Sequence, residues 1–156
     1  TPEDLQEKFQ FLLEIRNKLD ETHNAISDMR LIKSQIGKMK ALISEPEKSP
    51  EIIKEGNRID SVLTTIEEQL YQTKLKSNQD MLNYPIMLNN KLAHVASLAS
   101  MSNDRPTDQM YAVAEDITAK IDDELKKWKD ILNVDIPAYN EMIRSHNINV
   151  IGIPEE

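Results

Sequence analysis

The sequence predicts an all-α protein, an up-and-down antiparallel four-helix bundle with a long first helix and a proline-kinked or broken fourth helix. Three observations predict this fold class. Apolar residues recur every three or four positions along most of the chain, as on one face of a helix. Prolines and groups of turn-forming residues interrupt that pattern. Only three of the 156 residues are glycine, and the sequence lacks the alternating apolar and polar runs that are typical of strands.

The first helix is expected over about residues 2–44. Thr1 is a suitable N-cap, Pro2 fits the first helical position, and Asp4 lies near the positive end of the helix dipole. At 1.5 Å per residue this helix is roughly 60 Å long. One stripe recurs along it at helical spacing, formed by Leu12, Ile15, Leu19, Thr22, Ile26, Met29, Ile32, Ile36, Met39 and Ile43.

The second helix is expected over about residues 50–75. Pro46 and Pro50 cannot both lie inside one helix, so the segment between the helices is a turn, with Ser49 as the next N-cap. Gly56 interrupts the apolar face, and two interpretations stay open: a local weakness of the helix, or a point of close helix approach. The face consists of Ile52, Ile59, Leu63, Ile66, Leu70 and Thr73.

The third helix is expected over about residues 85–101, because Pro85 follows a polar, turn-rich segment. Its apolar face consists of Leu88, Leu92, Val95 and Leu98.

The fourth helix is expected over about residues 107–145, with Thr107 as its cap. Pro137 either kinks this helix or starts a short continuation through Tyr139 and Met142. Residues 147–156 are expected to form an extended tail, which leaves residues 1–146 for the bundle. The face of the fourth helix consists of Met110, Val113, Ala114, Ile117, Ile121, Leu125, Trp128 and Leu132.

Composition excludes several classes of function. A formal charge of -8, spread along the chain, disfavours nucleic acid and anionic membranes, since both need clustered Lys and Arg. No apolar run approaches the roughly 18–20 residues that span a bilayer, so membrane insertion is not expected. The sequence has no cysteine, which removes disulfides, thiolate catalysis and cysteine-bound metals.

The histidines do not predict a metal site or a catalytic centre. A di-metal site in a helical bundle needs two Glu-x-x-His units, and the nearest spacing here is the single pair Asp20 and His23. A histidine at the edge of the apolar stripe is the favoured interpretation of His23. His94 is expected to be partly buried and hydrogen-bonded rather than a general base. The acidic run at 122–124 indicates a solvated face rather than a calcium loop, and neither a cofactor nor catalytic activity is expected of this domain.

Residues 83–92 and 106–109 stand out from the periodic background. In a binding interpretation, Tyr84 stacks on a sugar or peptide, and the amides of Asn89 and Asn90 hydrogen-bond to it, with His94 one turn further along. In the favoured structural interpretation, Asn83 and Thr107 cap helices and Tyr84 packs over one end of the bundle. The candidate partner-binding residues are Tyr84, Asn89, Asn90 and His94.

The same segments carry a resemblance to a known family. The stretches LYQTK from Leu70, LNYPI from Leu82, LNNKL from Leu88, PTDQ from Pro106 and TPEDL from Thr1 resemble the C-terminal helical domain of large bacterial proteins. The main body of those proteins is a sortilin-like, Asp-box (BNR) repeat β-propeller, and they are described as glycosyl hydrolase-like. The resemblance implies an exported parent, in the periplasm or at the cell surface. Any hydrolase chemistry would belong to the propeller, so no active-site residue carries over.

These observations lead to two functional hypotheses. The chain starts at Thr1 without a leader, so it is expected to be a fragment or a processed product whose targeting signal lies in the parent. The first hypothesis is a non-catalytic structural or interaction module that packs against, spaces or dimerises the propeller region. The alternative is a carbohydrate- or peptide-binding accessory domain. The corresponding partners are other domains of the parent, a homodimer partner or a glycan.

Overall fold

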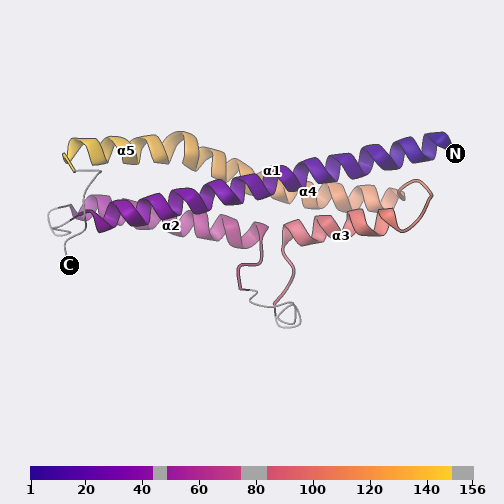
Figure 1. Cartoon of the computed structure of the whole chain (residues 1–156), viewed down its shortest axis with the longest axis horizontal. Coiled ribbons are helices and arrows are strands. Elements are labelled where there is room, and N and C mark those ends of the chain that lie inside the picture. Colours follow the sequence, from indigo (N-terminus) through magenta and orange to yellow (C-terminus); the bar gives the residue numbers. More distant parts are fainter. Residues whose placement is uncertain (44–48, 75–83, 149–156) are drawn as a thin grey trace.

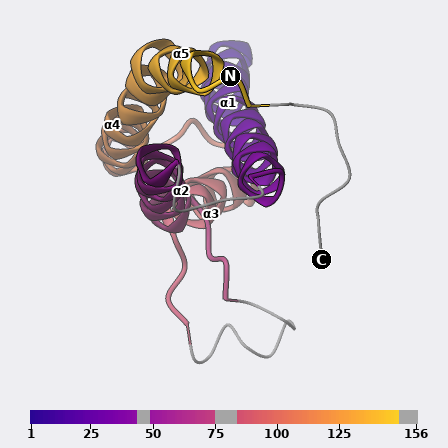
Figure 2. The same cartoon turned by 90° about the vertical axis from the view of Figure 1, so that its left-hand side faces the viewer.

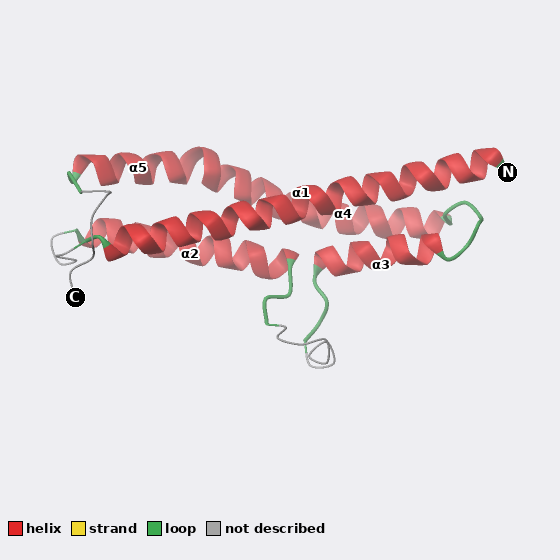
Figure 3. Cartoon of the chain, in the orientation of Figure 1, coloured by secondary structure: helices red, strands yellow, loops and turns green. Residues whose placement is uncertain are grey.

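The fold is a bundle of helices, as the apolar periodicity predicts. A computed structural model of the chain describes residues 1–43, 49–74 and 84–148, and these residues form helices and connecting loops without any strand (Figure 3). The predicted all-α bundle is therefore confirmed. Its elements are α1 (Pro2–Ala41), α2 (Pro50–Leu70), α3 (Leu88–Ser100), α4 (Asp108–Asp130), a π-helical turn η3 (Ile131–Asp135) and α5 (Ile136–Ser145).

The helices make three long passes along one axis. α1 runs the whole length of the molecule, α2 and α3 follow one another in the opposite direction, and α4, η3 and α5 return (Figure 1). α2 and α3 thus run the same way, which departs from strict up-and-down alternation. The physical reason lies in length: α1 has 40 residues, whereas α2 has 21 and α3 has 13, so both are needed end to end to cover its stripe.

The rod has two halves with different helix partners. In the half that contains the N-terminus, called the entry half below, the first part of α1 packs with α3 and α4. In the opposite half, called the exit half below, the second part of α1 packs with α2. There α2 also contacts α5 and the end of α4 (Figures 1 and 2).

The core follows the predicted stripes closely. Every residue of the stripe predicted for the first helix is buried or half-buried, and Ile52, Ile59, Leu63 and Leu70 of α2 have no exposed surface. Four predicted core residues are exposed, and for these the prediction is wrong. Thr73 lies beyond the end of α2, and Ile131 is buried in place of Leu132. Leu98 and Val113 lie at the edges of their helices, where Ala99 and Ala114 face the core.

Helix ends account for most other differences. The first helix ends at Ala41 rather than 44, and Ser49 takes the N-cap position of α2 without a side-chain capping hydrogen bond. α2 ends at Leu70 rather than 75, and α3 begins at Leu88 rather than Pro85. The predictions for Ser44, for Asn83 as a cap and for residues 149–156 of the tail fall outside the described residues.

Pro137 lies where a π-helical turn interrupts the last pass between α4 and α5, at the place where the sequence predicts a kink or a break. It occupies the first turn of α5, directly after η3, and the backbone N–H of Ile136 bonds to the carbonyl of Ile131, five residues back. A proline lacks the N–H for an α-helical bond, and its ring crowds the carbonyl four residues earlier. The wider π-helical turn accommodates both effects, so the helical path continues through Tyr139 and Met142 as one of the two interpretations expected.

Gly56 marks a close approach of helices. A Cβ atom added there would lie 2.7 Å from the hydroxyl of Tyr139 on α5 and 3.1 Å from Cγ2 of Ile36 on α1. Gly56 therefore lets α2, α5 and α1 meet, and the second of the two interpretations of this glycine holds.

Candidate functional site

The polar residues of the core gather at the junction, which we define as the point where α2 ends and α3 begins. Tyr71 takes an extended conformation, which stops α2. Gln72 is buried, and its amide nitrogen donates to the carbonyl of Pro85 at 2.8 Å while its amide oxygen accepts from the N–H of Lys74 at 3.1 Å. One side chain thus holds both ends of the connection between α2 and α3.

A buried carboxylate ties the junction to α1. Glu67 is 5% exposed, and it accepts from Nε of Arg30 at 2.6 Å and from Nζ of Lys33 at 3.4 Å. The Arg30 guanidinium also lies 5.3 Å from the centre of the Tyr71 ring. A buried charge needs such partners, since an unpaired buried charge strongly destabilises the folded protein. Two cations on α1 therefore fix the end of α2.

Sequence reasoning missed Glu67 and Gln72. A signal was present for Glu67, because it lies four residues after Leu63 and eight after Ile59, on the apolar face of α2. An acid at such a position predicts a charge partner on a neighbouring helix. Gln72 carried no such signal, because its role depends on where the chain returns to the bundle.

Of the four predicted partner-binding residues, Asn89 is buried and the other three reach the surface. Asn89 is buried, with its amide nitrogen 3.3 Å from Nε2 of His23 on α1, and its amide oxygen accepts from the N–H of Asn90. Tyr84 is exposed, and so is His94, contrary to the partial burial expected. Their binding role stays a prediction. Asn90 and His94 lie one turn apart on α3, whereas Asn89 turns inward to His23 of α1.

A groove of about 630 Å³ runs beside the junction, between the ends of α2 and α3 and the face of α4. Its α4 wall carries both signs of charge, from Lys120, Asp123 and Lys127 among others. Lys127 pairs with Glu124 at 2.7 Å, and Lys120 pairs with Asp116 at 2.6 Å. Because the charges largely compensate one another, this groove shows no preference for an anionic or a cationic ligand.

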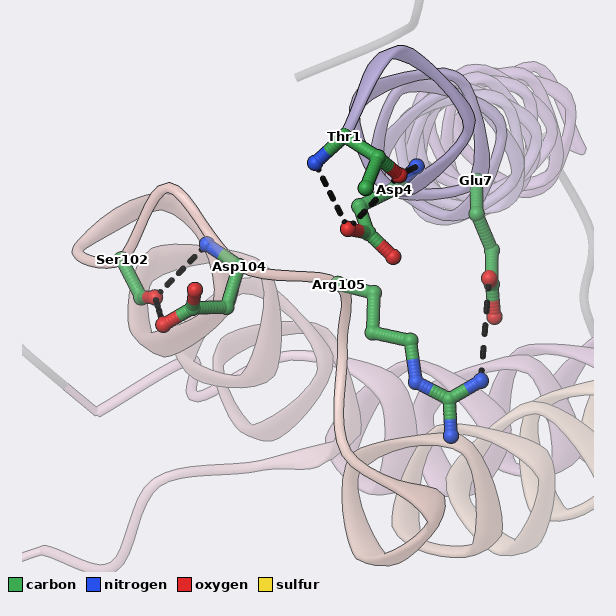
Figure 4. Close-up of polar contacts among 6 residues, drawn as sticks. All are labelled: Thr1, Asp4, Glu7, Ser102, Asp104 and Arg105. Atoms are coloured by element: carbon green, nitrogen blue, oxygen red, sulfur yellow. Dashed lines mark hydrogen bonds and ion pairs between the residues drawn. The ribbon is translucent and has the colours of Figure 1, made fainter.

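A second polar cluster closes the start of the rod. Figure 4 shows Arg105, in the loop between α3 and α4, reaching toward Glu7 of α1, with their charged atoms 3.9 Å apart. The Tyr111 hydroxyl donates to the same carboxylate at 3.1 Å, and the Lys8 ammonium donates to the carbonyl of Ser102. Thr1 and Asp4 form the capping box that starts α1. These contacts attach the start of α1 to the loop between α3 and α4.

Two further ion pairs link the passes, Lys18 with Asp122 and Arg58 with Asp135. These contacts shift the pKa values of the residues involved. Burial works against the charge of Lys18, but hydrogen bonds to Asp122 and Glu21 outweigh it and raise its pKa. A hydrogen bond from Arg58 lowers the pKa of Glu55, and bonds to Glu55 and to Asp135 of η3 raise the pKa of Arg58. Such pairs hold helices in register rather than preparing a group for proton transfer.

The described part of the chain contains no cluster of three or more His, Asp or Glu side chains that could hold a metal ion. The Asp20 and His23 spacing is not joined by further acids there, and the Nε2 of His23 faces Asn89. None of the helices within residues 1–43, 49–74 and 84–148 has the length and apolarity to cross a membrane.

Comparison of the chain with protein-family models, with curated proteins and with solved structures gave no match.

Proposed function

We propose that this chain is a non-catalytic spacer, a structural module that separates the propeller region of a larger exported protein from whatever lies or binds at its far end. The observation that carries this proposal is the number of passes. Three passes place Thr1 and Ser145 at opposite ends of the rod (Figure 1). An even number of passes would return both to the same end.

The length and bracing of the rod support this function. α1 has 40 residues, so it spans roughly 60 Å at 1.5 Å per residue. Contacts to α1 are spread along this length: Lys8 to Ser102, Lys18 to Asp122 at 2.7 Å, and Lys40 to Asn57 at 2.6 Å. A helix braced at both ends and in the middle transmits position without bending, which is what a spacer requires.

The resemblance to helical domains of sortilin-like, BNR-repeat propeller proteins supports the rest of the proposal. The resemblance implies a larger parent protein that is exported to the periplasm or cell surface, with its propeller next to the Thr1 end of this chain. In this arrangement the glycosyl hydrolase-like chemistry belongs to the propeller, and the helical module holds the exit half about 60 Å away from it.

The spacing is tested directly by a distance measurement. The chain has no cysteine, so Glu3→Cys with Arg144→Cys carries two spin labels at exposed positions of the two ends. Pulsed dipolar spectroscopy is expected to give one distance of roughly 55 Å. Glu3→Cys with Asn103→Cys is the matched control, and it is expected to give a short distance because residue 103 lies beside the start of α1.

The functional claim is tested in the parent. Small-angle scattering of the parent with and without the helical module should show a maximum dimension that differs by roughly 50–60 Å. A difference below about 20 Å, with the long internal distance intact, means that the rod lies along the propeller, and the spacer function is then wrong.

A further inference from the structure

Two hollows between α1 and α4 join into one groove in the entry half. One has a volume of about 570 Å³ and lies at the first turns of α1, and the other, of about 700 Å³, follows further along both helices. Both are lined by Phe11, Glu14 and Tyr111, so they form one continuous groove, called the α1/α4 groove below. On α1 it extends from Pro2 to Glu21, which is roughly 30 Å.

The side chains that line the α1/α4 groove are mostly acidic where they are charged. Six carboxylates line it, and within the described part of the chain its lining includes one basic residue, Lys18. The groove beside the junction is different, because three acidic residues and four lysines line it. The α1/α4 groove therefore favours a cationic partner. Its six carboxylates belong to Glu3, Glu7, Glu14, Glu21, Glu115 and Asp122.

Neighbouring cations neutralise only part of this charge. Lys18 pairs with Glu21 at 2.6 Å and with Asp122 at 2.7 Å. Two further cations, Lys129 and Arg105, lie 3.7 Å and 3.9 Å from carboxylates of the groove. Three cations thus face six carboxylates, which leaves about half of the negative charge for a partner. Within residues 1–43, 49–74 and 84–148, no ion pair involves Glu3, Glu14 or Glu115.

The carboxylates repeat every seven residues along both walls. On α1 this spacing joins Glu7, Glu14 and Glu21, and on α4 it joins Glu115 and Asp122. Seven residues make about two helical turns, so the carboxylates of each wall form a row along the groove at intervals of roughly 10 Å. A helix that lies between two others presents its flanking side chains with the same repeat. The two rows therefore match a helix with Lys or Arg at every seventh position on each flank.

The floor between the two rows is apolar. Phe11 and Tyr111 meet there edge to face, and Tyr111 is only half-buried. On the α4 side the floor carries the small side chains of Ala114 and Ala119, and Ala119 is exposed. Small side chains let the backbone of a partner helix come close, and apolar side chains of that helix can pack against the Tyr111 ring.

From these observations we infer that the α1/α4 groove is the docking site of a basic amphipathic helix from another polypeptide. The apolar face of that helix packs on the floor, and its Lys or Arg side chains pair with the two rows of carboxylates. A second copy of this chain does not fit, since its formal charge of -8 would be repelled by those rows. This docking site is independent of the spacer function, because it lies along the side of the rod and not at its far end.

Binding of a designed peptide tests this docking site. The probe is a helical peptide of roughly 20 residues with Leu at the a and d positions and Lys at the e and g positions of its heptads, and the matched control has Glu in place of Lys. We expect the chain to bind the Lys peptide, with an affinity that falls as salt is added, and not to bind the Glu peptide. Absence of binding to the Lys peptide at low salt would overturn the proposal, as would equal binding of the two peptides.

Charge variants distinguish the groove from the acidic surface as a whole. Glu14→Gln with Glu115→Gln removes two exposed carboxylates of the groove and is expected to weaken binding of the Lys peptide at least about 5-fold. Glu51→Gln with Glu68→Gln removes the same charge at exposed positions of α2, and affinity should change less than about 2-fold. Equal weakening by the two double variants would overturn the proposal, because binding would then follow net charge alone.

Protection of a thiol locates the bound peptide. The chain has no cysteine, so Ala119→Cys places a single thiol in the groove, and Ala93→Cys places one at an exposed position of α3 as the matched control. With the Lys peptide at about ten times its Kd, alkylation at position 119 should slow about 10-fold and alkylation at position 93 should not change. Equal protection at both positions contradicts a site in the groove. Protection at position 119 that rises with protein concentration in the absence of peptide contradicts it too, in favour of a second copy.

Discussion

The two halves of the rod use the same α1 helix but close around it differently. In the entry half, Phe11 of α1 meets Tyr111 of α4 edge to face, with ring centres 4.7 Å apart, and Lys18 bridges the outer rim. In the exit half, Gly56 of α2 leaves room for the side chain of Tyr139 of α5, and α1 and α5 border a groove lined by both apolar and polar side chains. The entry half is thus closed by an aromatic pair and an ion pair, and the exit half by the close approach of α2 and α5 at Gly56.

The aromatic pair of the entry half should give the largest effect. Phe11→Ala is expected to lower the free energy of unfolding by about 3–5 kcal/mol, because Phe11 is 4% exposed and leaves a cavity. Phe9→Ala, two residues away and 60% exposed, is the control and should stay within about 0.5 kcal/mol. Denaturant unfolding measures both, and similar losses for the two variants would remove Phe11 as the anchor of this half.

The buried carboxylate that joins the halves should come next. Glu67→Gln keeps the shape of the side chain but removes the charge that faces Arg30 and Lys33, and the expected loss is about 2 kcal/mol. The neighbouring Glu68→Gln is the control, because Glu68 is exposed. In thermal unfolding the Glu67 variant should melt roughly 4–8 °C lower, and equal melting of the two variants would contradict a structural role for the pair.

Substitution of two glycines by alanine should change the stability of the protein in opposite directions and so test the tight contact at Gly56. A Cβ at Gly37 meets nothing within 4 Å, so Gly37→Ala should stabilise the protein by about 0.5–1 kcal/mol through helix propensity. Gly56→Ala should instead destabilise it by about 1 kcal/mol, because the new methyl group meets Tyr139 and Ile36.

The Tyr139 hydroxyl supplies the control for Gly56. It is buried without a hydrogen-bond partner among the described residues, so Tyr139→Phe should cost little. In that background Gly56→Ala loses its closest clash and should become neutral or stabilising, which a double-mutant cycle measures. Additive effects would show that the two residues do not limit each other.

The ion pair between Glu55 and Arg58 on α2 should give the smallest effect, and it depends on pH. Arg58 holds the pKa of Glu55 below its ordinary value of 4.5, so the pair stabilises the folded protein above that pH. This contribution, about 0.5–1 kcal/mol, should disappear as pH falls through the lowered pKa. Wild type and Glu55→Gln should therefore differ in unfolding free energy at pH 7 and converge toward pH 3; a constant difference would show that charge is not the cause.

The sequence predicted local features well. The stripe from Leu12 to Ile43 and the start of α2 at Pro50 depend on residues only a few positions apart, so periodicity and proline chemistry suffice to place them. Leu98 and Val113 are exposed because an apolar stripe indicates which side of a helix is apolar but not how much of that side the neighbouring helices cover. His94 was misplaced for the same reason.

The junction and the groove show a different limit. That Glu67 has Arg30 and Lys33 as partners, or that Gln72 holds Pro85, depends on which segments lie side by side after folding. No spacing rule connects residues more than ten positions apart, so a sequence pattern identifies Glu67 as unusual without naming its partners. The groove between α1 and α5 is likewise formed by two helices that are far apart in the sequence.

By itself the sequence determined that the chain is helical, where prolines interrupt it, and that the first helix is long enough to span the whole molecule. Only the tertiary structure decided that α2 and α3 run in the same direction, that the chain therefore makes three passes, and that α2, α5 and α1 meet closely at Gly56. The physical reason is range. Helix formation follows from contacts within a turn or two, whereas direction and closure follow from matching faces that lie far apart in the chain.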